Sequence, residues 1–133
     1  MNTKGNLALA VLAGISVGAV SVMALHAQEP KTPPAYLIAE TDVTDRAAFQ
    51  KYADKVPETL APFSGSFHYV VRGGKVQALE GQPPKGIVVI AFDSTEKALA
   101  WYNSPAYQAI KPTRQGASVS RMFLAEGLPP QYL

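Results

Sequence analysis

Hydrophobic and polar residues change their spacing several times along the chain, and each change marks an expected element. The segments 35–41, 67–72 and 118–126 are rich in β-branched and aromatic residues or alternate with polar ones, which predicts three strands. The segment 87–92 is apolar at every position, which is typical of a central strand that is covered on both faces. The pattern therefore predicts at least four strands.

Helical spacing appears in two places between these strands. From about 45 to 61 the apolar residues recur along one stripe, and Pro57 within it predicts a kink or a restart. The segment 93–96 has the layout of a capping box, so a second helix is expected to begin there. At 103–105 the sequence Asn-Ser-Pro predicts that this helix stops and that another begins at once, because serine is a preferred N-cap and proline suits the first helical position.

Turn residues and prolines set the expected boundaries of the domain. The glycine pair at 73–74 indicates a hairpin whose returning strand, 75–80, is short. The proline-rich segment 28–34 is expected to be a disordered lead-in, and 128–133 a C-terminal tail. One domain at 35–127 remains between them.

The order of these elements is β-α-β-(short β)-β-α-β, which predicts an α+β class, ferredoxin-like βαββαβ fold. Its four-stranded antiparallel sheet carries two helices on one face. Alternation within the strands places Glu40, His68, Arg72 and Arg121 on the other face, among aliphatic residues. A half-apolar face on so small a domain predicts a homodimer that closes sheet to sheet.

The first 27 residues are expected to be a signal peptide. Lys4 precedes an uncharged run from 7 to 25, and small residues follow at the end of that run. Cleavage near Ala27 predicts a periplasmic or secreted protein with no membrane association afterwards. The alternative is an uncleaved membrane anchor, since the uncharged run approaches the ~20 residues that span a bilayer.

Composition excludes several kinds of chemistry. The chain contains no cysteine, so it forms no disulfide and uses no thiolate as a nucleophile or metal ligand. Its formal net charge is only +2, which argues against nucleic acid as a partner. Neither a cofactor nor a metal site is expected, because the chain lacks phosphate-binding, zinc-binding and nucleophile-elbow motifs. A small-molecule ligand or a second protein chain is the more natural partner.

A set of short motifs spread over residues 35–127 carries a family resemblance. The motifs are Ala35-Tyr36-Leu37-Ile38-Ala39-Glu40, Tyr52, Val56-Pro57, Val71-Arg72-Gly73-Gly74, Leu79-Glu80-Gly81, Pro84-Lys85, Ala100-Trp101-Tyr102-Asn103-Ser104-Pro105, Tyr107-Gln108 and Ser120-Arg121. With them the chain resembles the family known as domain of unknown function 1330. The resemblance implies a subunit of a dimeric α+β barrel, in which two sheets pack face to face. Relatives in that wider class include cofactor-free monooxygenases, isomerases and haem-handling enzymes. The family itself has no settled activity, so the resemblance implies a fold and no reaction.

The candidate catalytic residues are Glu40, His68 and Arg121. In this topology the end of the first strand meets the start of the last one, so Glu40 is expected beside Arg121. The pair is either a charged floor to a pocket or a simple cross-strand ion pair, and the second interpretation is favoured. His68 is the only histidine of the expected domain, and one histidine alone makes a poor metal site.

The candidate ligand-binding residues are Tyr36, Arg72, Tyr102 and Tyr107. Arg72 precedes a glycine turn that could bind an anion, although such glycines more often only permit a positive φ. Tyr102 and Tyr107 flank the Ser-Pro corner beside Trp101, and each either lines a pocket or packs on the surface. Trp101 itself is expected in the core.

Three classes of function remain open from the sequence. The first is a small-molecule-binding domain without chemistry. The second is a cofactor-independent enzyme, of monooxygenase or isomerase type, that works in a cavity on the face of the sheet away from the helices. The third is a structural or interaction dimer without a ligand.

Overall fold

The computed structural model describes residues 32–132, which form an α+β fold of one sheet and one helical layer. The elements in chain order are β1 (Ala35–Val43), α1 (Arg46–Leu60), β2 (Phe67–Arg72), β3 (Gly86–Phe92), α2 (Thr95–Tyr102), α3 (Pro105–Ala117) and β4 (Ser118–Glu126). Short 3-10 turns follow α1 and close the C-terminal tail. The expected signal peptide and most of the lead-in lie outside the described residues. Among residues 32–132, no helix is long and apolar enough to cross a membrane.

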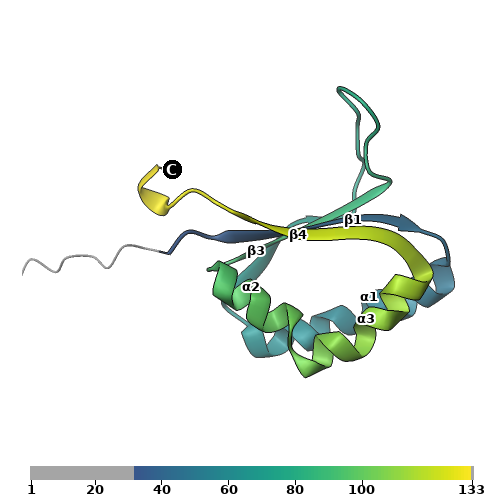
Figure 1. Cartoon of the computed structure of the whole chain (residues 1–133), viewed down its shortest axis with the longest axis horizontal. Helices are drawn as coiled ribbons and strands as arrows, with labels where there is room; N and C mark the ends of the chain where they lie inside the picture. The colour runs from purple at the N-terminus through teal and green to yellow at the C-terminus, as the bar shows by residue number, and fades with distance from the viewer. Residues whose placement is uncertain (1–31, 133) are drawn as a thin grey trace, which may run out of the picture.

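The sheet is antiparallel with the strand order β2-β3-β1-β4, and the helices all cover one of its faces (Figure 1). The expected ferredoxin-like arrangement is therefore confirmed. In the register, β1 lies between β3 and β4, so that Leu37 is opposite Ile90 on one side and Leu124 on the other. The uncovered side of the sheet is called the open face below.

Each α-helix begins at an oxygen-bearing cap that the sequence indicates. The side chains of Asp45, Ser94 and Ser104 each accept a hydrogen bond from the backbone N–H three residues later. α2 ends at Tyr102 and α3 begins at Pro105, which confirms the expected corner. A kink or a restart is expected at Pro57; α1 continues through it to Leu60 as one helix, so the restart does not occur.

Two expectations for β2 and the segment after it are wrong. Residues 75–80 form no strand, because β2 pairs with β3 directly and leaves this segment without a partner. The segment 73–85 instead stands away from the sheet on the side opposite the helices (Figure 1). Arg72 is also on the other face from the one expected. The pairing between β2 and β3 has an irregularity between Tyr69 and Val71, which makes Val70 an extra residue and turns Arg72 towards the helices.

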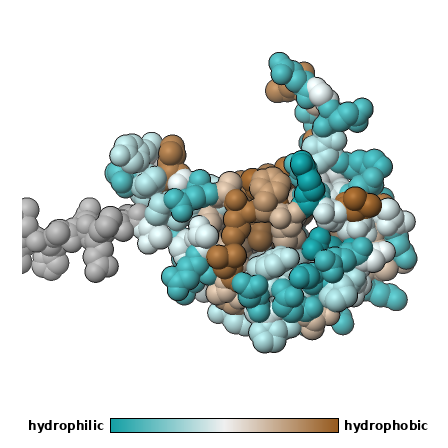
Figure 2. All heavy atoms as spheres, viewed as in Figure 1, coloured by the Kyte–Doolittle hydropathy of each residue, from teal (hydrophilic) through white to brown (hydrophobic). Residues whose placement is uncertain are grey.

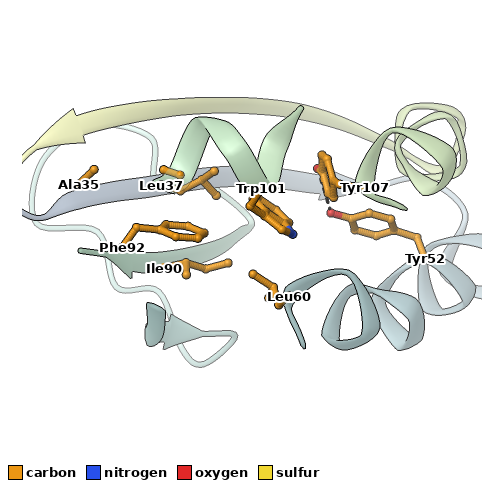
Figure 3. Close-up of a cluster of buried hydrophobic side chains, with 9 residues drawn as sticks. Ala35, Leu37, Tyr52, Leu60, Ile90, Phe92, Trp101 and Tyr107 are labelled. Carbon is orange, nitrogen blue, oxygen red and sulfur yellow. Dashed lines mark hydrogen bonds between the residues drawn. The ribbon is translucent and has the colours of Figure 1, made fainter. Parts of the chain in front are cut away.

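The core lies between the helices and the sheet and is built around Trp101 (Figure 3). This side chain is 1% exposed, which confirms its expected place in the core. Its ring stacks on Phe92 with 5.8 Å between centroids, and Tyr107 packs against it at 4.2 Å. The indole Nε1 donates to Thr59 Oγ1 at 3.0 Å, so the one polar atom of the ring is satisfied.

Candidate functional site

The open face brings together two of the three candidate catalytic residues. Arg121 lies directly opposite Glu40 in the β1–β4 register, and its Nε donates to Glu40 Oε2 at 2.9 Å. The predicted proximity of these two side chains is thus confirmed. His68 is exposed on β2, with β3 and β1 between it and β4. Because neighbouring strands lie about 4.8 Å apart, His68 is separated by roughly 14 Å or more from Arg121. The three residues do not form one site.

A second ion pair lies near the first. Lys85 Nζ donates to Asp42 Oδ2 at 2.6 Å, which links the start of β3 to the end of β1. Both charges of β1 on this part of the sheet, Glu40 and Asp42, therefore have a cationic partner. Pairs of this kind on a surface need no ligand to account for them.

A cavity of about 90 Å³ lies on the other side of the sheet, beneath the helices. Its walls are mainly apolar and come from both layers of the fold, since all four strands of the sheet and the helices α1, α2 and α3 contribute residues. The residues that line it are Leu37, Ala39, Thr41, Tyr52, Ala53, Val56, Tyr69, Arg72, Val88, Ile90, Trp101, Arg114 and Met122. We call this space the helix-side cavity.

Two arginines from different elements line the helix-side cavity. Arg114 comes from α3 and is only 6% exposed. Its Nε is buried without a hydrogen-bond partner, and no carboxylate within residues 32–132 forms an ion pair with it. Arg72 is exposed at the end of β2, where its guanidinium lies 5.0 Å from the ring centroid of Tyr69. The β-bulge at Val70 is what turns Arg72 towards this cavity.

The hydroxyls of Thr41 and of several tyrosines supply the other polar groups near the cavity. The hydroxyls of Tyr52 and Tyr107 are hydrogen-bonded at 3.3 Å (Figure 3). Burial raises the pKa of Tyr52 well above its ordinary value, the hydroxyl of Tyr107 raises this pKa further, and the charge of Arg114 opposes the shift only in part. Burial also raises the pKa of Tyr69. Both side chains are therefore neutral phenols near neutral pH. The Tyr107 hydroxyl donates to Met122 Sδ, so the Tyr52 proton is directed to Tyr107, and of these two phenols only Tyr69 can donate to a ligand.

The four candidate ligand-binding residues do not share one site. Tyr36 is half-buried on β1 and belongs to the open face, whereas Arg72 lines the helix-side cavity. Tyr107 is fully buried in the core, where its hydroxyl also donates to Met122 Sδ at 3.7 Å. Tyr102 packs on Tyr107 and lies beneath Lys111, whose Nζ is 5.2 Å from the ring centroid.

Tyr102 also lines an apolar groove of about 270 Å³ between α2 and the edge strand β4. The other lining residues are Leu37, Leu99, Met122, Phe123 and Leu124. Figure 2 shows hydrophobic side chains gathered at the middle of this face of the molecule. Every residue in the groove is apolar except for the tyrosine hydroxyl, so the groove offers little to orient a polar ligand.

Sequence reasoning missed Arg114, Tyr52 and Tyr69 as members of a site. A signal for Arg114 is present in α3, because it follows Tyr107 by seven residues and precedes Ala117 by three. This spacing puts an arginine on the buried stripe of the helix. A charged residue on such a stripe is unusual and marks a position where function or pairing is expected.

The described residues do not gather metal ligands. Within 32–132, no group of three or more His, Asp or Glu side chains is placed to hold a metal ion. The functional chemistry of the helix-side cavity is that of two guanidinium groups, neutral phenols and an apolar wall.

This arrangement of sheet and helices is that of the ferredoxin-like α+β proteins. Similar solved structures include a protein of unknown function from Rhodopseudomonas palustris, with a TM-score of 0.56, 16% identity and coverage of 74% of this chain and 85% of that one. The cofactor-independent oxygenase SnoaB from Streptomyces nogalater has a TM-score of 0.52 at 12% identity, covering 71% and 92% of the two chains. A dimeric ferredoxin-like protein of unknown function from Thermobifida fusca has a TM-score of 0.51 at 14% identity, covering 74% and 96%.

The family follows from the sequence match. The model of the family described as a domain of unknown function (DUF1330) matches residues 34–128, and the chain belongs to that family. No curated protein matches the chain in sequence.

Proposed function

We propose that this protein is a small-molecule-binding domain and that the helix-side cavity is its ligand site. The observation that carries the proposal is Arg114. Its side chain lines an apolar cavity, its Nε is buried without a hydrogen-bond partner, and it has no carboxylate partner among residues 32–132. A folded protein loses stability when it buries a charge in this way. Such a group is retained most readily where a ligand completes its interactions.

Binding is favoured over cofactor-independent catalysis by the kinds of side chain that line the cavity. An enzyme that removes a proton from its substrate needs a base, usually a carboxylate or an imidazole. In the described part of the chain, neither of these groups lines the helix-side cavity. On the open face, Glu40 is already paired with Arg121, and His68 lies across the sheet from them. The similarity to SnoaB supports the fold and adds no catalytic residue.

The sole tryptophan of the chain provides the test, because Trp101 lines the cavity. A ligand that enters the cavity is expected to change the fluorescence of Trp101, and small organic probes can be screened in this way. Ala53→Phe places a ring into the cavity from α1 and is expected to abolish the response. Ala47→Phe, on the exposed side of the same helix, is the matched control and is expected to keep it. An equal response from both variants would locate the ligand elsewhere.

We also propose that the protein forms a homodimer through the open face. Val119 is strongly exposed and Phe123 is 43% exposed there, on the edge strand β4 beside Ile38 of β1. The Thermobifida fusca neighbour is a dimeric ferredoxin-like protein, which supports a dimer for this chain. Native mass spectrometry of the wild type is expected to give twice the chain mass, and Phe123→Arg is expected to give the monomer. A wild type that stays monomeric at micromolar concentration would contradict this proposal and leave the cavity proposal standing.

Export is the remaining proposal about where the protein works. It rests on Lys4, the uncharged run 7–25 and the small residues before Gln28, all of which lie outside the described residues. N-terminal sequencing of the protein from a periplasmic extract is expected to begin near Gln28. A chain that retains Met1 and stays with the membrane fraction would instead indicate the uncleaved anchor.

A further inference from the structure

We propose that the ligand of the helix-side cavity is a small organic monocarboxylate, whose carboxylate pairs with Arg114 and whose short alkyl part lies against the apolar wall. This inference rests on the proposed function and specifies the chemical class of the ligand. Three features of the cavity lead to it. They are the unpaired donor of Arg114, the positive charge and hydrogen-bond donors of the other polar side chains, and the volume of the cavity with its apolar wall.

Arg114 presents an unpaired hydrogen-bond donor at the helix-side cavity. Guanidinium is always protonated in proteins, so this side chain cannot lower its cost of burial by losing its charge. Its Nε is a donor with no hydrogen-bond partner. A carboxylate matches the planar fork of a guanidinium group and can accept two parallel hydrogen bonds from it.

The other polar groups that line the cavity also favour a ligand with a negatively charged acceptor. Arg72 adds a second positive charge at the end of β2, and the hydroxyls of Tyr69 and Thr41 can donate hydrogen bonds. Among residues 32–132, no Asp or Glu side chain lines the space and repels an anion. The cavity therefore offers donors and positive charge to one end of a ligand.

The volume of the cavity and its apolar wall indicate the size and polarity of the rest of the ligand. A cavity of about 90 Å³ has room for several non-hydrogen atoms, which suits a carboxylate with a short alkyl chain. Leu37, Val88 and Ile90 supply the wall that such a chain would contact. An inorganic anion would leave most of this wall in contact with a charge, which is unfavourable. Butyrate is a probe of suitable size and charge.

The experiment compares sodium butyrate with butyramide by isothermal titration calorimetry. Butyramide has nearly the same shape and no charge. The wild type is expected to bind butyrate, and to bind butyramide about tenfold more weakly or worse, because a charge-assisted interaction is lost. Arg114→Met is expected to remove the preference for butyrate. Lys111→Met removes a positive charge from the same helix outside the cavity and is expected to bind butyrate as the wild type does.

A second measurement guards against a variant that simply misfolds. Replacing an unpaired buried charge with an apolar side chain often stabilises a fold, so Arg114→Met is expected to unfold at a higher temperature than the wild type without ligand. Added butyrate is expected to raise the unfolding temperature of the wild type and of Lys111→Met, and to leave that of Arg114→Met unchanged.

The outcomes separate this inference from the proposed function. Equal affinity for butyrate and butyramide, or full butyrate affinity in folded Arg114→Met, would overturn the carboxylate assignment and leave a neutral-ligand site in the cavity. Binding of neither probe, together with no change in Trp101 fluorescence across a wider panel of organic compounds, would overturn both. Butyrate binding that persists in Ala53→Phe would place the anion outside the cavity and overturn both as well.

Discussion

Trp101 on α2 and Thr59 on α1 are joined by a buried hydrogen bond, in which the indole Nε1 donates to Thr59 Oγ1 at 3.0 Å. The same hydroxyl donates to the backbone oxygen of Val56 at 2.7 Å. Thr59 thus gives the largest core side chain its acceptor and keeps its own proton bonded within α1. The pair fixes how α2 sits against α1 above the sheet.

The first prediction concerns this hydrogen bond. Thr59→Val keeps the shape of the side chain and removes the acceptor, so the buried indole N–H is left without a partner. The free energy of unfolding is expected to fall by about 1–3 kcal/mol. Thr59→Ser retains the hydroxyl and is expected to lose less than the valine variant does. Urea unfolding followed by far-UV circular dichroism measures both, and a valine variant as stable as the wild type would show that the indole is satisfied in another way.

The second prediction concerns alkaline pH and Tyr52. Burial raises the pKa of Tyr52 in the folded state, whereas an unfolded tyrosine titrates near pH 10. The folded state therefore holds this proton more tightly than the unfolded state does. Its contribution to stability is complete below about pH 10 and is lost as the pH rises above that value. Tyr69 shifts in the same direction and adds to the effect.

The measurement is the urea midpoint between pH 8 and pH 11. The wild type is expected to lose stability steeply at the upper end, and Tyr52→Phe is expected to show a shallower fall. Tyr132→Phe, in the exposed tail, is the control and is expected to follow the wild type. A Tyr52→Phe profile identical to that of the wild type would show that other groups cause the alkaline loss.

Much of the fold could be predicted because local and long-range signals agree. The strand pattern and the right order of elements place β1 between β3 and β4, and that order alone brings Glu40 next to Arg121. The corner between α2 and α3 is equally local, since Ser104 caps a helix whose first residue is proline. Features of this kind depend on chain order and on backbone chemistry, which a sequence displays directly.

The position of Arg72 could not be predicted from alternation. A regular strand over Phe67–Arg72 puts Arg72 on the open face, and nothing in six consecutive non-glycine residues reveals that Val70 is an extra residue. One inserted residue reverses the facing of everything after it. The bulge exists only in the pairing with β3, so it is a property of two strands and is not visible in one.

The helix-side cavity was missed for a related reason. Its residues come from strands, from α1 and from two further helices, and only packing brings them together. Arg114 could have been noticed by its place on the stripe of Tyr107 and Ala117. Its lack of a partner, however, depends on which side chains surround it, and that requires the structure.

The third prediction compares a glycine in crowded surroundings, Gly127, with one in open surroundings, Gly116. A Cβ atom at Gly127 would lie 2.7 Å from Tyr36 Cε2 and 2.9 Å from Pro34 Cγ, and the Gly127 N–H donates to Pro34 O at 2.7 Å. Gly127→Ala is therefore expected to reduce the free energy of unfolding by about 1–3 kcal/mol, as overpacking does. A Cβ atom at Gly116 in α3 meets nothing within 4 Å. Gly116→Ala is expected to stabilise by about 0.4–1 kcal/mol.

Thermal unfolding of the two alanine variants checks the difference in sign. Both replace glycine with the same residue, so each serves as the control for the other. Stabilisation by Gly127→Ala would mean that Tyr36 and Pro34 yield at little cost, and that the end of β4 is not held closely against the segment before β1.

The last prediction compares Leu60 with Leu79. Leu60 is 1% exposed at the end of α1, whereas Leu79 is 91% exposed in the segment 73–85. Leu60→Ala removes buried contacts and is expected to cost about 2–5 kcal/mol in the free energy of unfolding. Leu79→Ala is expected to change it by less than about 0.5 kcal/mol, since the side chain contributes little to the core. Urea unfolding at low protein concentration measures both; a large loss from Leu79→Ala that grows with protein concentration would place this segment against a second subunit.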